Sequence, residues 1–444
     1  MTENSQARLP QTLKLPSLVI FGLAYLTPLI VLGIFGVIAS TTQGASSGAY
    51  LIALLAMLFT ANSYSRLAGI YPEAGSAYTY VRKILGNRIG FLVGWLTLLD
   101  YLFLPMVIWL IGGAYLNAQF PDIPTALWIV LFVLITTALN IIGIKVADKV
   151  NLILMAFQIL VLVIFVVLTC LTLAGASQNL LSLAPFTGGS NSNFALITAG
   201  AAIAAYSFLG FDAVTTLAEE THEAEKTVPR AIFFVALIGG AIFIVVSYFG
   251  QLVHPGGIFE NVDSAGFEIA KTVGGNLFAS IFVAALIIAQ FTSGIAAQAA
   301  GSRLLFAMGR DKMLPSKIFG FLSRRTQTPV YSIITIGLVG ALAVFLDLTT
   351  STSFINFGAF VSFTMVNISL ILLWAQSKKN AGHQGRLVRD LVAPTIGALV
   401  IVYLLLQLDG AAIRLGLIWL GLGLLLLAVK TRFFTHNPPE FLAE

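Results

Sequence analysis

The chain has 444 residues, of which 58% are hydrophobic and only 10% are charged. A soluble globular protein usually has about 25% charged residues, so this composition excludes a compact soluble protein and indicates an integral membrane protein. The net charge of +5 is therefore assigned to one side of a membrane and not to a nucleic-acid partner, and the single cysteine, Cys170, excludes intramolecular disulfides and cysteine-built metal sites.

The chain begins with a polar arm, residues 1–16, and the apolar stretch after it lacks a small-residue cleavage site, so we expect no cleavable signal peptide. A bilayer core about 30 Å thick needs roughly 20 apolar residues per helix. Apolar runs of about this length predict twelve membrane-spanning helices. The expected spans are 17–40, 47–69, 89–118, 125–144, 150–174, 194–218, 230–252, 267–300, 329–346, 352–375, 392–407 and 413–429.

The direction of these spans follows from lysine and arginine, which concentrate in cytoplasmic segments of membrane proteins. With a cytoplasmic N-terminus, 22 of the 24 basic residues fall inside, and only Lys271 and Arg414 fall outside. One span more or fewer would destroy this alternation. We therefore expect a multi-pass protein of the cytoplasmic membrane, with both termini in the cytoplasm.

The first and sixth spans are interrupted by residues that break helices. These residues are Gly22, Pro28, Gly33 and Gly36 in the first span and Gly200 and Gly210 in the sixth. Scattered glycine and proline also occur where membrane helices pack closely. However, irregular backbone at mid-membrane survives only where it lines a cavity. Because the sixth span begins five spans after the first, the two cross in opposite senses, which predicts an inverted-repeat transporter with its site at the breaks.

Three candidate residues share one depth in the membrane. At about 1.5 Å per residue, Thr27 lies roughly 15 Å into the first span, Asp100 roughly 16 Å into the third and Tyr206 roughly 18 Å into the sixth. A carboxylate at this depth costs about 2.5–3.5 kcal/mol on insertion scales. We expect Asp100 to contact an amine or to carry a proton, although a structural hydrogen bond to a neighbouring helix is the alternative.

Further candidates each have a functional and a structural interpretation. Tyr101 either stacks on an ammonium group or packs between helices. Asp212, below Tyr206, either accepts a proton or braces the break. The acidic cluster Glu219, Glu220, Glu223 and Glu225 is interpreted as a solvated loop, with a cytoplasmic gate as the alternative. Gln158 is a polar intramembrane residue of the fifth span, and the body of that span has no lysine that could carry a coupled proton. Other intramembrane polar residues either line the path or satisfy their own helix: Gln290, Thr292, Ser293, Ser362 and Asn367.

Several stretches resemble the amino acid–polyamine–organocation permeases, and within them the bacterial putrescine importers. Two cytoplasmic loops are similar to signatures of the family, "YPEAGSAYTYV" at 71–81 and "SRLLFAMGRDKMLP" at 302–315. The similarity also covers "GLAYLTP" (22–28), "GWLTLLDYLFLPM" (94–106), "SFLGFDAVTTLAEET" (207–221) and "INFGAFVSFTMVNIS" (355–369). It extends from about residue 12 to the tenth span.

The resemblance implies an all-α, leucine-transporter-like fold. Two inverted five-helix repeats, 17–174 and 194–375, would be followed by two peripheral helices within 392–429 and a cytoplasmic tail, 430–444. In this family the substrate lies against the unwound parts of helices 1 and 6. The residues implied here are Tyr25, Leu26, Thr27, Pro28, Ser207, Phe208 and Gly210, with Tyr206 as a gating aromatic and Asp212 where relatives carry an acid.

Two departures from the family pattern bear on the substrate. Leu26, Thr27 and Pro28 stand where amino-acid permeases often have a Gly-Ser/Ala-Gly triplet, and Pro28 has no N–H for a substrate carboxylate. Gly33 stands where the putrescine importers carry a second acid, so we expect weaker discrimination between diamines and monoamines than in those importers.

The function predicted is import of a small amine-bearing solute similar to putrescine or a polyamine, coupled to protons through Asp100 or Asp212. The alternative is a neutral or cationic amino-acid permease or exchanger. A membrane enzyme is disfavoured because the spans carry neither a nucleophile–base pair nor a histidine cluster, and a channel because no polar ring is visible. We expect no cofactor and no metal, the lipid bilayer as environment, and a monomer or homodimer.

Overall fold

The computed structural model describes residues 13–73, 76–143, 148–176, 179–189, 192–310, 314–379, 386–433 and 435. Most of the predicted N-terminal arm and C-terminal tail lies outside these ranges. The described part is helical, with one isolated parallel bridge between Leu13 and Thr221. The first half contains α1 (Leu15–Leu26), α2 (Ile30–Gly33), α3 (Phe35–Thr42), α4 (Ser46–Ile70), α5 (Ser76–Leu85), α6 (Asn87–Gln119), α7 (Thr125–Ile142), α8 (Asp148–Gly175) and α9 (Ala184–Thr187).

The second half contains the remaining helices, including short 3₁₀ and π segments labelled η. They are α10 (Phe194–Ala204), η1 (Ala205–Phe208), η2 (Phe211–Glu220), α11 (Ala224–Val253), η3 (Val262–Ser264), α12 (Ala265–Arg310), α13 (Ser316–Phe319), α14 (Val330–Ala341), η4 (Leu342–Phe345), α15 (Leu348–Lys379), η5 (Val388–Val392), α16 (Ala393–Leu406) and α17 (Gly410–Lys430).

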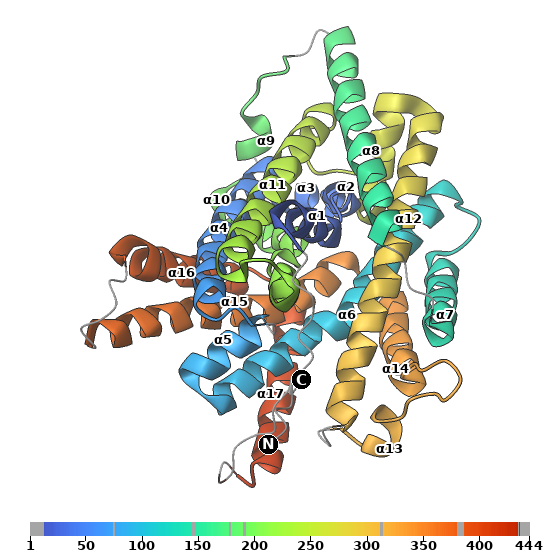
Figure 1. Ribbon diagram of the computed structural model, residues 1–444. Helices are drawn as coiled ribbons and strands as arrows, with labels where there is room; N and C mark the ends of the chain where they lie inside the picture. Colours follow the sequence, from blue (N-terminus) through green and yellow to red (C-terminus); the bar gives the residue numbers. More distant parts are fainter. Residues whose placement is uncertain are drawn as a thin grey trace.

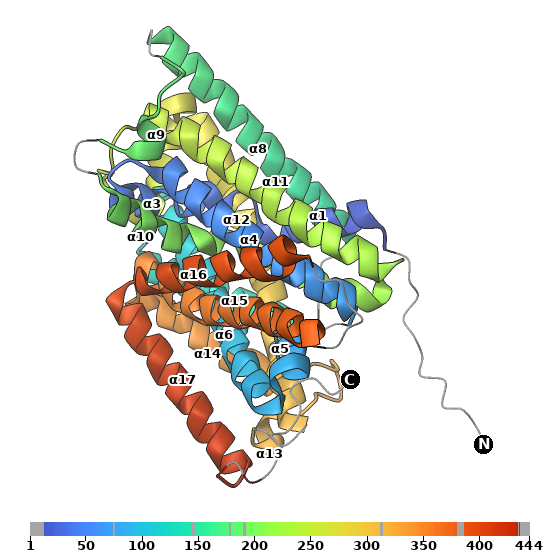
Figure 2. The same ribbon diagram turned by 90° about the vertical axis from the view of Figure 1, so that its left-hand side faces the viewer.

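The helices account for the predicted apolar runs. Within the described residues, eleven helical segments are long and apolar enough to cross a membrane. The ninth predicted span, 329–346, corresponds to α14 and η4, an apolar stretch that is shorter than the others. The short segments α1 to α3 lie in the middle of the bundle, between α11 and α12 (Figure 1), while α17 lies on its outside in both views (Figures 1 and 2).

The first span is broken between α1 and α2. Thr27 ends α1 in the left-handed region, with φ 51° and ψ 80°. The cause lies in the next residue, because the ring of Pro28 disfavours the right-handed helical conformation of the residue before it. Pro28 also supplies no N–H to continue the helix. A second irregularity, at Ile34, separates α2 from α3.

The sixth span is broken between η1 and η2. Leu209 is extended, with φ −59° and ψ 127°, and Gly210 follows with φ 105° and ψ −5°. A residue with a side chain rarely adopts the conformation of Gly210. Both breaks fall within the stretches implied by the family resemblance, and neither half of the sixth span continues as an α-helix through the break.

One end of the bundle is covered by the connection between α11 and α12. The backbone of this connection reaches α3 directly, since a Cβ atom added at Gly36 would overlap the carbonyl oxygen of Val262. At Gly257 an added Cβ would overlap the carbonyl oxygen of Ala39. Tyr115 on α6 adds a hydrogen bond of 2.5 Å to the carbonyl oxygen of Leu32. We refer to this end as the closed end.

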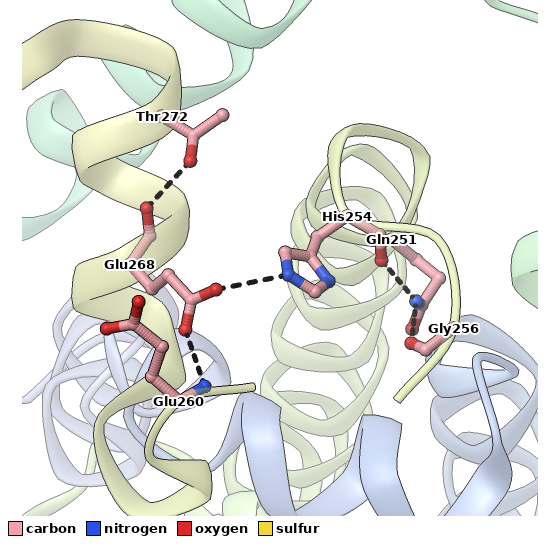
Figure 3. A network of polar contacts seen from close by, with 6 residues as sticks. All are labelled: Gln251, His254, Gly256, Glu260, Glu268 and Thr272. Atoms are coloured by element: carbon pink, nitrogen blue, oxygen red, sulfur yellow. Dashed lines mark hydrogen bonds and ion pairs between the residues drawn. The ribbon is translucent and has the colours of Figure 1, made fainter. Parts of the chain in front are cut away.

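Side chains hold the same connection in place, as Figure 3 shows. His254 Nε2 lies 3.3 Å from Glu268 Oε1 on α12, and the other carboxylate oxygen accepts the Glu260 N–H at 3.2 Å. Gln251 Nε2 donates to the carbonyl oxygens of His254 and Gly256, each at 2.7 Å. The connection is therefore fixed at both ends and in its middle.

The opposite end carries most of the basic residues. There the chain before α1 pairs with the end of η2: Leu13 N–H donates to the Glu220 carbonyl oxygen, and His222 N–H donates to that of Leu13, both at 3.0 Å. Arg66 forms a two-pronged salt bridge with Asp390, with N···O distances of 2.5 and 2.9 Å. Segments predicted to be cytoplasmic thus contact one another. We refer to this end as the basic end.

Candidate functional site

A cavity of about 420 Å³ lies beside both helix breaks, between α1, α6, α8, η2 and α12. Each wall comes from the half of its helix that is nearer the basic end. Its main lining residues are Phe21, Tyr25, Thr27, Tyr101, Leu104, Met155, Gln158, Ala213, Thr216, Thr292, Ser293 and Arg303. The cavity therefore extends from the breaks toward the basic end and not toward the closed end.

Tyr25 and Gly210 bring the two breaks together. A Cβ atom added at Gly210 would overlap the ring of Tyr25, so the ring lies directly on the glycine backbone. Tyr25 also lines the cavity, together with Thr27 from the first break and Tyr101 from α6. Three of the predicted substrate-binding residues thus share one cavity wall, beside the glycine that interrupts the sixth span.

Asp100 lies behind these tyrosines. Its Oδ1 atom is buried and has no hydrogen-bond partner among the described residues. Tyr25, Tyr101 and Tyr206 are close enough to interact electrostatically with its carboxylate. Asp212 is also within electrostatic range. In the described part of the chain no lysine or arginine pairs with Asp100, so its charge is available to a cationic ligand or a proton.

Asp212 has structural partners that Asp100 lacks. Its Oδ2 accepts a hydrogen bond of 2.7 Å from the Ser76 hydroxyl at the start of α5. The backbone amides of Gly210 and Asp212 also interact with the carboxylate, as expected for an acid at the start of a helical segment. Asp212 therefore connects the break to α5, whichever further role it has.

Several predicted site residues do not line the cavity. Leu26 packs against Gly239 on α11, and Pro28 is buried. Ser207 shares a hydrogen bond of 3.1 Å with Tyr50 on α4, and the ring of Phe208 packs edge-on against Phe243 on α11. Both side chains thus face the packing between α4 and α11. Tyr206 is 6% exposed and does not line the cavity, but it interacts electrostatically with Asp100 and with Tyr25.

Some lining residues were outside the main set of predicted site residues, although Thr292 and Ser293 were weighed from the sequence as residues that line the path. Gln158 on α8 is 6% exposed, and its Oε1 is buried without a partner among the described residues. Thr292 and Ser293 line the same cavity from α12, whereas Gln290 is buried elsewhere. A polar residue in an otherwise apolar helix is the available signal for Gln158. No comparable signal exists for Arg303, which stands at the end of a span like many other basic residues.

Other polar residues considered from the sequence have structural partners. Asn367 accepts a hydrogen bond of 2.6 Å from Ser63 and donates one of 3.3 Å to Thr60, which joins α15 to α4. In the acidic cluster, Glu223 forms an exposed salt bridge of 3.3 Å with Lys226. The side chain of Glu219 lies outside the described set. The solvated-loop interpretation agrees with the exposure of this pair.

A larger cavity, about 670 Å³, lies on the other side of α12. It is lined by Asn140 and the segment before α14, including Thr326 and Thr328, and it shares Thr292 and Arg303 with the first cavity. None of its lining residues belongs to either helix break. We therefore assign the candidate site to the smaller cavity, because residues of the helix breaks line it and two of its lining tyrosines, Tyr25 and Tyr101, interact electrostatically with the Asp100 carboxylate.

Comparison with known proteins shows the family to which the chain belongs. Residues 18–414 match the family model described as amino acid permease. The chain is 40% identical over 445 residues to the low-affinity putrescine importer PlaP of Escherichia coli (strain K12), covering 98% of this chain and 97% of that protein. It is 25% identical over 427 residues to the branched-chain amino acid permease BcaP of Bacillus subtilis (strain 168), covering 90% and 89%. It is 31% identical over 356 residues to the vacuolar cationic amino acid transporter 4 of Arabidopsis thaliana, covering 75% and 58%. The chain therefore belongs to the amino acid permease family.

Proposed function

We propose that this protein is a secondary active transporter that imports a small amine-bearing solute, similar to putrescine or a polyamine, across the cytoplasmic membrane. The observation that carries the proposal is the Asp100 carboxylate, whose Oδ1 atom is buried and has no hydrogen-bond partner in the described part of the chain. The similarity along almost the whole chain to a protein named as a putrescine importer supports the same substrate class.

The chemistry of the site suits a protonated amine. An ammonium group that leaves water needs a compensating partner, and the Asp100 carboxylate supplies one in a place where water is excluded. The rings of Tyr25 and Tyr101 line the approach, and aromatic faces attract cations. Binding would therefore pair two charges that are each unfavourable alone in the membrane.

The topology of the bundle fits import. We assign the basic end to the cytoplasm, because lysine and arginine concentrate there. The cavity extends toward that end while the closed end is covered by the connection between α11 and α12. This is the arrangement of a transporter after it has received solute from outside and before it releases it inside.

The same proposal includes twelve spans, with α14 and η4 as the short ninth. Residues 17–174 and 194–375 would form two inverted five-helix repeats, each beginning with a broken helix. Residues 392–429 would form peripheral helices, and residues 1–16 and 430–444 would lie in the cytoplasm. α1 with α2, and α10 with η1 and η2, would occupy equivalent places in the two repeats. The protein would act as a monomer or homodimer.

An amino acid is the alternative substrate, and one observation favours it. Arg303 lines the same cavity as Tyr25 and Tyr101, and its guanidinium group suits a carboxylate. Against it, Arg303 lies at the mouth of the cavity near the basic end, and Pro28 lacks the N–H that would hold a carboxylate at the break. The amine remains the main proposal.

The test is uptake of labelled 1,4-diaminobutane into liposomes that contain the purified full-length protein and carry an imposed proton gradient. We expect saturable uptake that collapses with a protonophore and persists when choline replaces sodium. Unlabelled diamines and monoamines should compete, and neutral amino acids should not. Competition by amino acids alone would support the alternative substrate, and strict dependence on sodium would overturn proton coupling.

A further inference from the structure

Gln158 is the buried polar group on the cavity wall that the proposed site leaves without a task. It lies on α8, a helix whose other described residues near the cavity are apolar, including Leu154 and Met155. Its Oε1 atom is buried and accepts no hydrogen bond from any described residue. A buried acceptor left without a partner costs about 1–3 kcal/mol, so the amide is poised to accept a hydrogen bond from a ligand.

The position of Gln158 relates it to Asp100. Gln158, Tyr25 and Tyr101 line one cavity, and both tyrosines interact electrostatically with the Asp100 carboxylate. Two unpartnered oxygens, one on a carboxylate and one on an amide, are therefore both close to this pair of tyrosines. A ligand that reaches both must carry two donor groups joined by an apolar segment.

We propose that Gln158 forms a second ammonium subsite, in which its Oε1 accepts a hydrogen bond from the distal ammonium of a diamine whose proximal ammonium is held by Asp100. This inference rests on the proposed function and deepens it. It assigns the diamine preference of the transporter to one neutral amide.

The surroundings of Gly33 explain why the second ammonium goes to α8. The three atoms nearest to a Cβ added at Gly33 belong to the side chains of Ile30, Ile111 and Leu286, at 3.4–3.8 Å. A cation placed on that side would find no acceptor among these apolar neighbours. Ser293 on α12 lines the same cavity as Gln158 and offers a hydroxyl. Polarity on one side of the site and its absence on the other give the diamine one orientation.

An amide and a carboxylate differ in what they select. Gln158 carries no formal charge, so it stabilises the distal ammonium through a dipole and leaves a monoamine almost unaffected. We therefore expect a moderate preference for 1,4-diaminobutane over 1-aminobutane, of about tenfold, the size of one hydrogen bond to a charged group. A carboxylate at the same position would make the preference larger.

The experiment compares half-saturation concentrations for counterflow uptake of labelled 1,4-diaminobutane and labelled 1-aminobutane in liposomes containing the full-length protein. Gln158→Met keeps the side-chain length and removes the oxygen. It should abolish the diamine preference while leaving the value for 1-aminobutane within about twofold. Gln158→Glu should increase the diamine preference. Gln290→Met makes the same chemical change at a buried glutamine outside the cavity and should change neither value.

The outcomes separate the inference from the proposed function. Uptake of neither amine by the unaltered protein would refute the proposed function and, with it, the subsite. Uptake of both amines, with an unchanged diamine preference in Gln158→Met, would overturn the subsite alone. An equal loss of both amines in Gln158→Met, without a gain in diamine preference in Gln158→Glu, would also overturn it and leave Gln158 as a packing residue. The opposite responses of the two variants would support it.

Discussion

Gly210 is the residue whose substitution tests the broken sixth span most directly. Its φ of 105° and ψ of −5° lie outside the regions that residues with side chains favour. The ring of Tyr25 also covers the glycine, so an added Cβ would overlap it. Gly210→Ala therefore perturbs both the backbone of the break and the contact that joins the two broken spans.

The two effects have comparable magnitudes. Holding alanine in a sparsely populated backbone conformation costs about 1–3 kcal/mol. Overpacking against the Tyr25 ring costs about 1–3 kcal/mol more. The broken conformation would rise by about 2–6 kcal/mol relative to a relaxed helix. Since each 1.4 kcal/mol is a factor of about ten in population, we expect the initial rate of uptake to fall at least about tenfold.

The assay is uptake of labelled 1,4-diaminobutane, with insertion checked by expression level and by a single symmetric peak in size-exclusion chromatography. Gly421→Ala is the matched control, because Gly421 lies in α17 with no atom within 4 Å of an added Cβ. Gly210→Asn separates the two effects, since asparagine tolerates positive φ better than alanine but still meets the ring. Because asparagine relieves only the backbone strain, it should transport better than Gly210→Ala and worse than the unaltered protein.

Uptake at the unaltered rate by Gly210→Ala would refute this reasoning. It would mean that the break of the sixth span relaxes without consequence for the site. Equal damage by Gly421→Ala would refute it in another way, because the loss would then follow from any added methyl group and not from the break.

Three further outcomes follow from the structure. Asp100→Asn should leave the protein inserted and raise the half-saturation concentration more than tenfold for both amines, since one charge-assisted hydrogen bond is worth about 1.5–3 kcal/mol; unchanged uptake and coupling would make Asp100 structural. Asp390→Asn, which removes the salt bridge with Arg66, should lower the free energy of unfolding by about 2 kcal/mol. This is less than for a fully buried salt bridge, because the Arg66 side chain is 34% exposed. Thermal unfolding measures the change, and an unchanged midpoint would contradict the prediction. In a Val37→Cys variant, Glu268→Gln should raise severalfold the labelling by a membrane-impermeant maleimide added outside. Lys271→Gln, at an exposed position on the same helix, should leave the labelling unchanged. Equal labelling with and without Glu268→Gln would show that the His254 contact does not hold the closed end.

The helix breaks were accessible from the sequence because two physical rules act together on them. Pro28 removes a backbone donor, and Gly210 permits a conformation that other residues avoid. Within a membrane such interruptions are confined to places where the backbone has other partners, so their positions carry information about the site. Asp100 was accessible for a similar reason, because a carboxylate at mid-membrane depth needs a function or a partner.

The walls of the cavity were less accessible. The described part of α8 is apolar nearly all round, so its sequence does not indicate which face meets the site, and Gln158 was considered only for its depth. In the unwound segment of the sixth span the helical period is lost. The directions of Ser207 and Phe208 therefore do not follow from spacing, and the structure turns both toward Tyr50 and Phe243. Where the backbone is irregular, side-chain direction depends on the neighbours.

The helix α6 links the candidate site to the closed end. It carries Asp100 near its middle and Tyr115 about 22 Å further along, at 1.5 Å per residue. The Tyr115 hydroxyl donates to the Leu32 carbonyl oxygen at 2.5 Å and accepts the Gly266 N–H at 3.2 Å, so it joins the first broken span to the start of α12. Pro105 stands between the two residues and removes one backbone hydrogen bond from α6. A ligand shifts a conformational equilibrium only by its difference in affinity for the two states. If a solute binds at Asp100 as proposed, α6 connects it to the closed end, with one weakened turn between the two at Pro105.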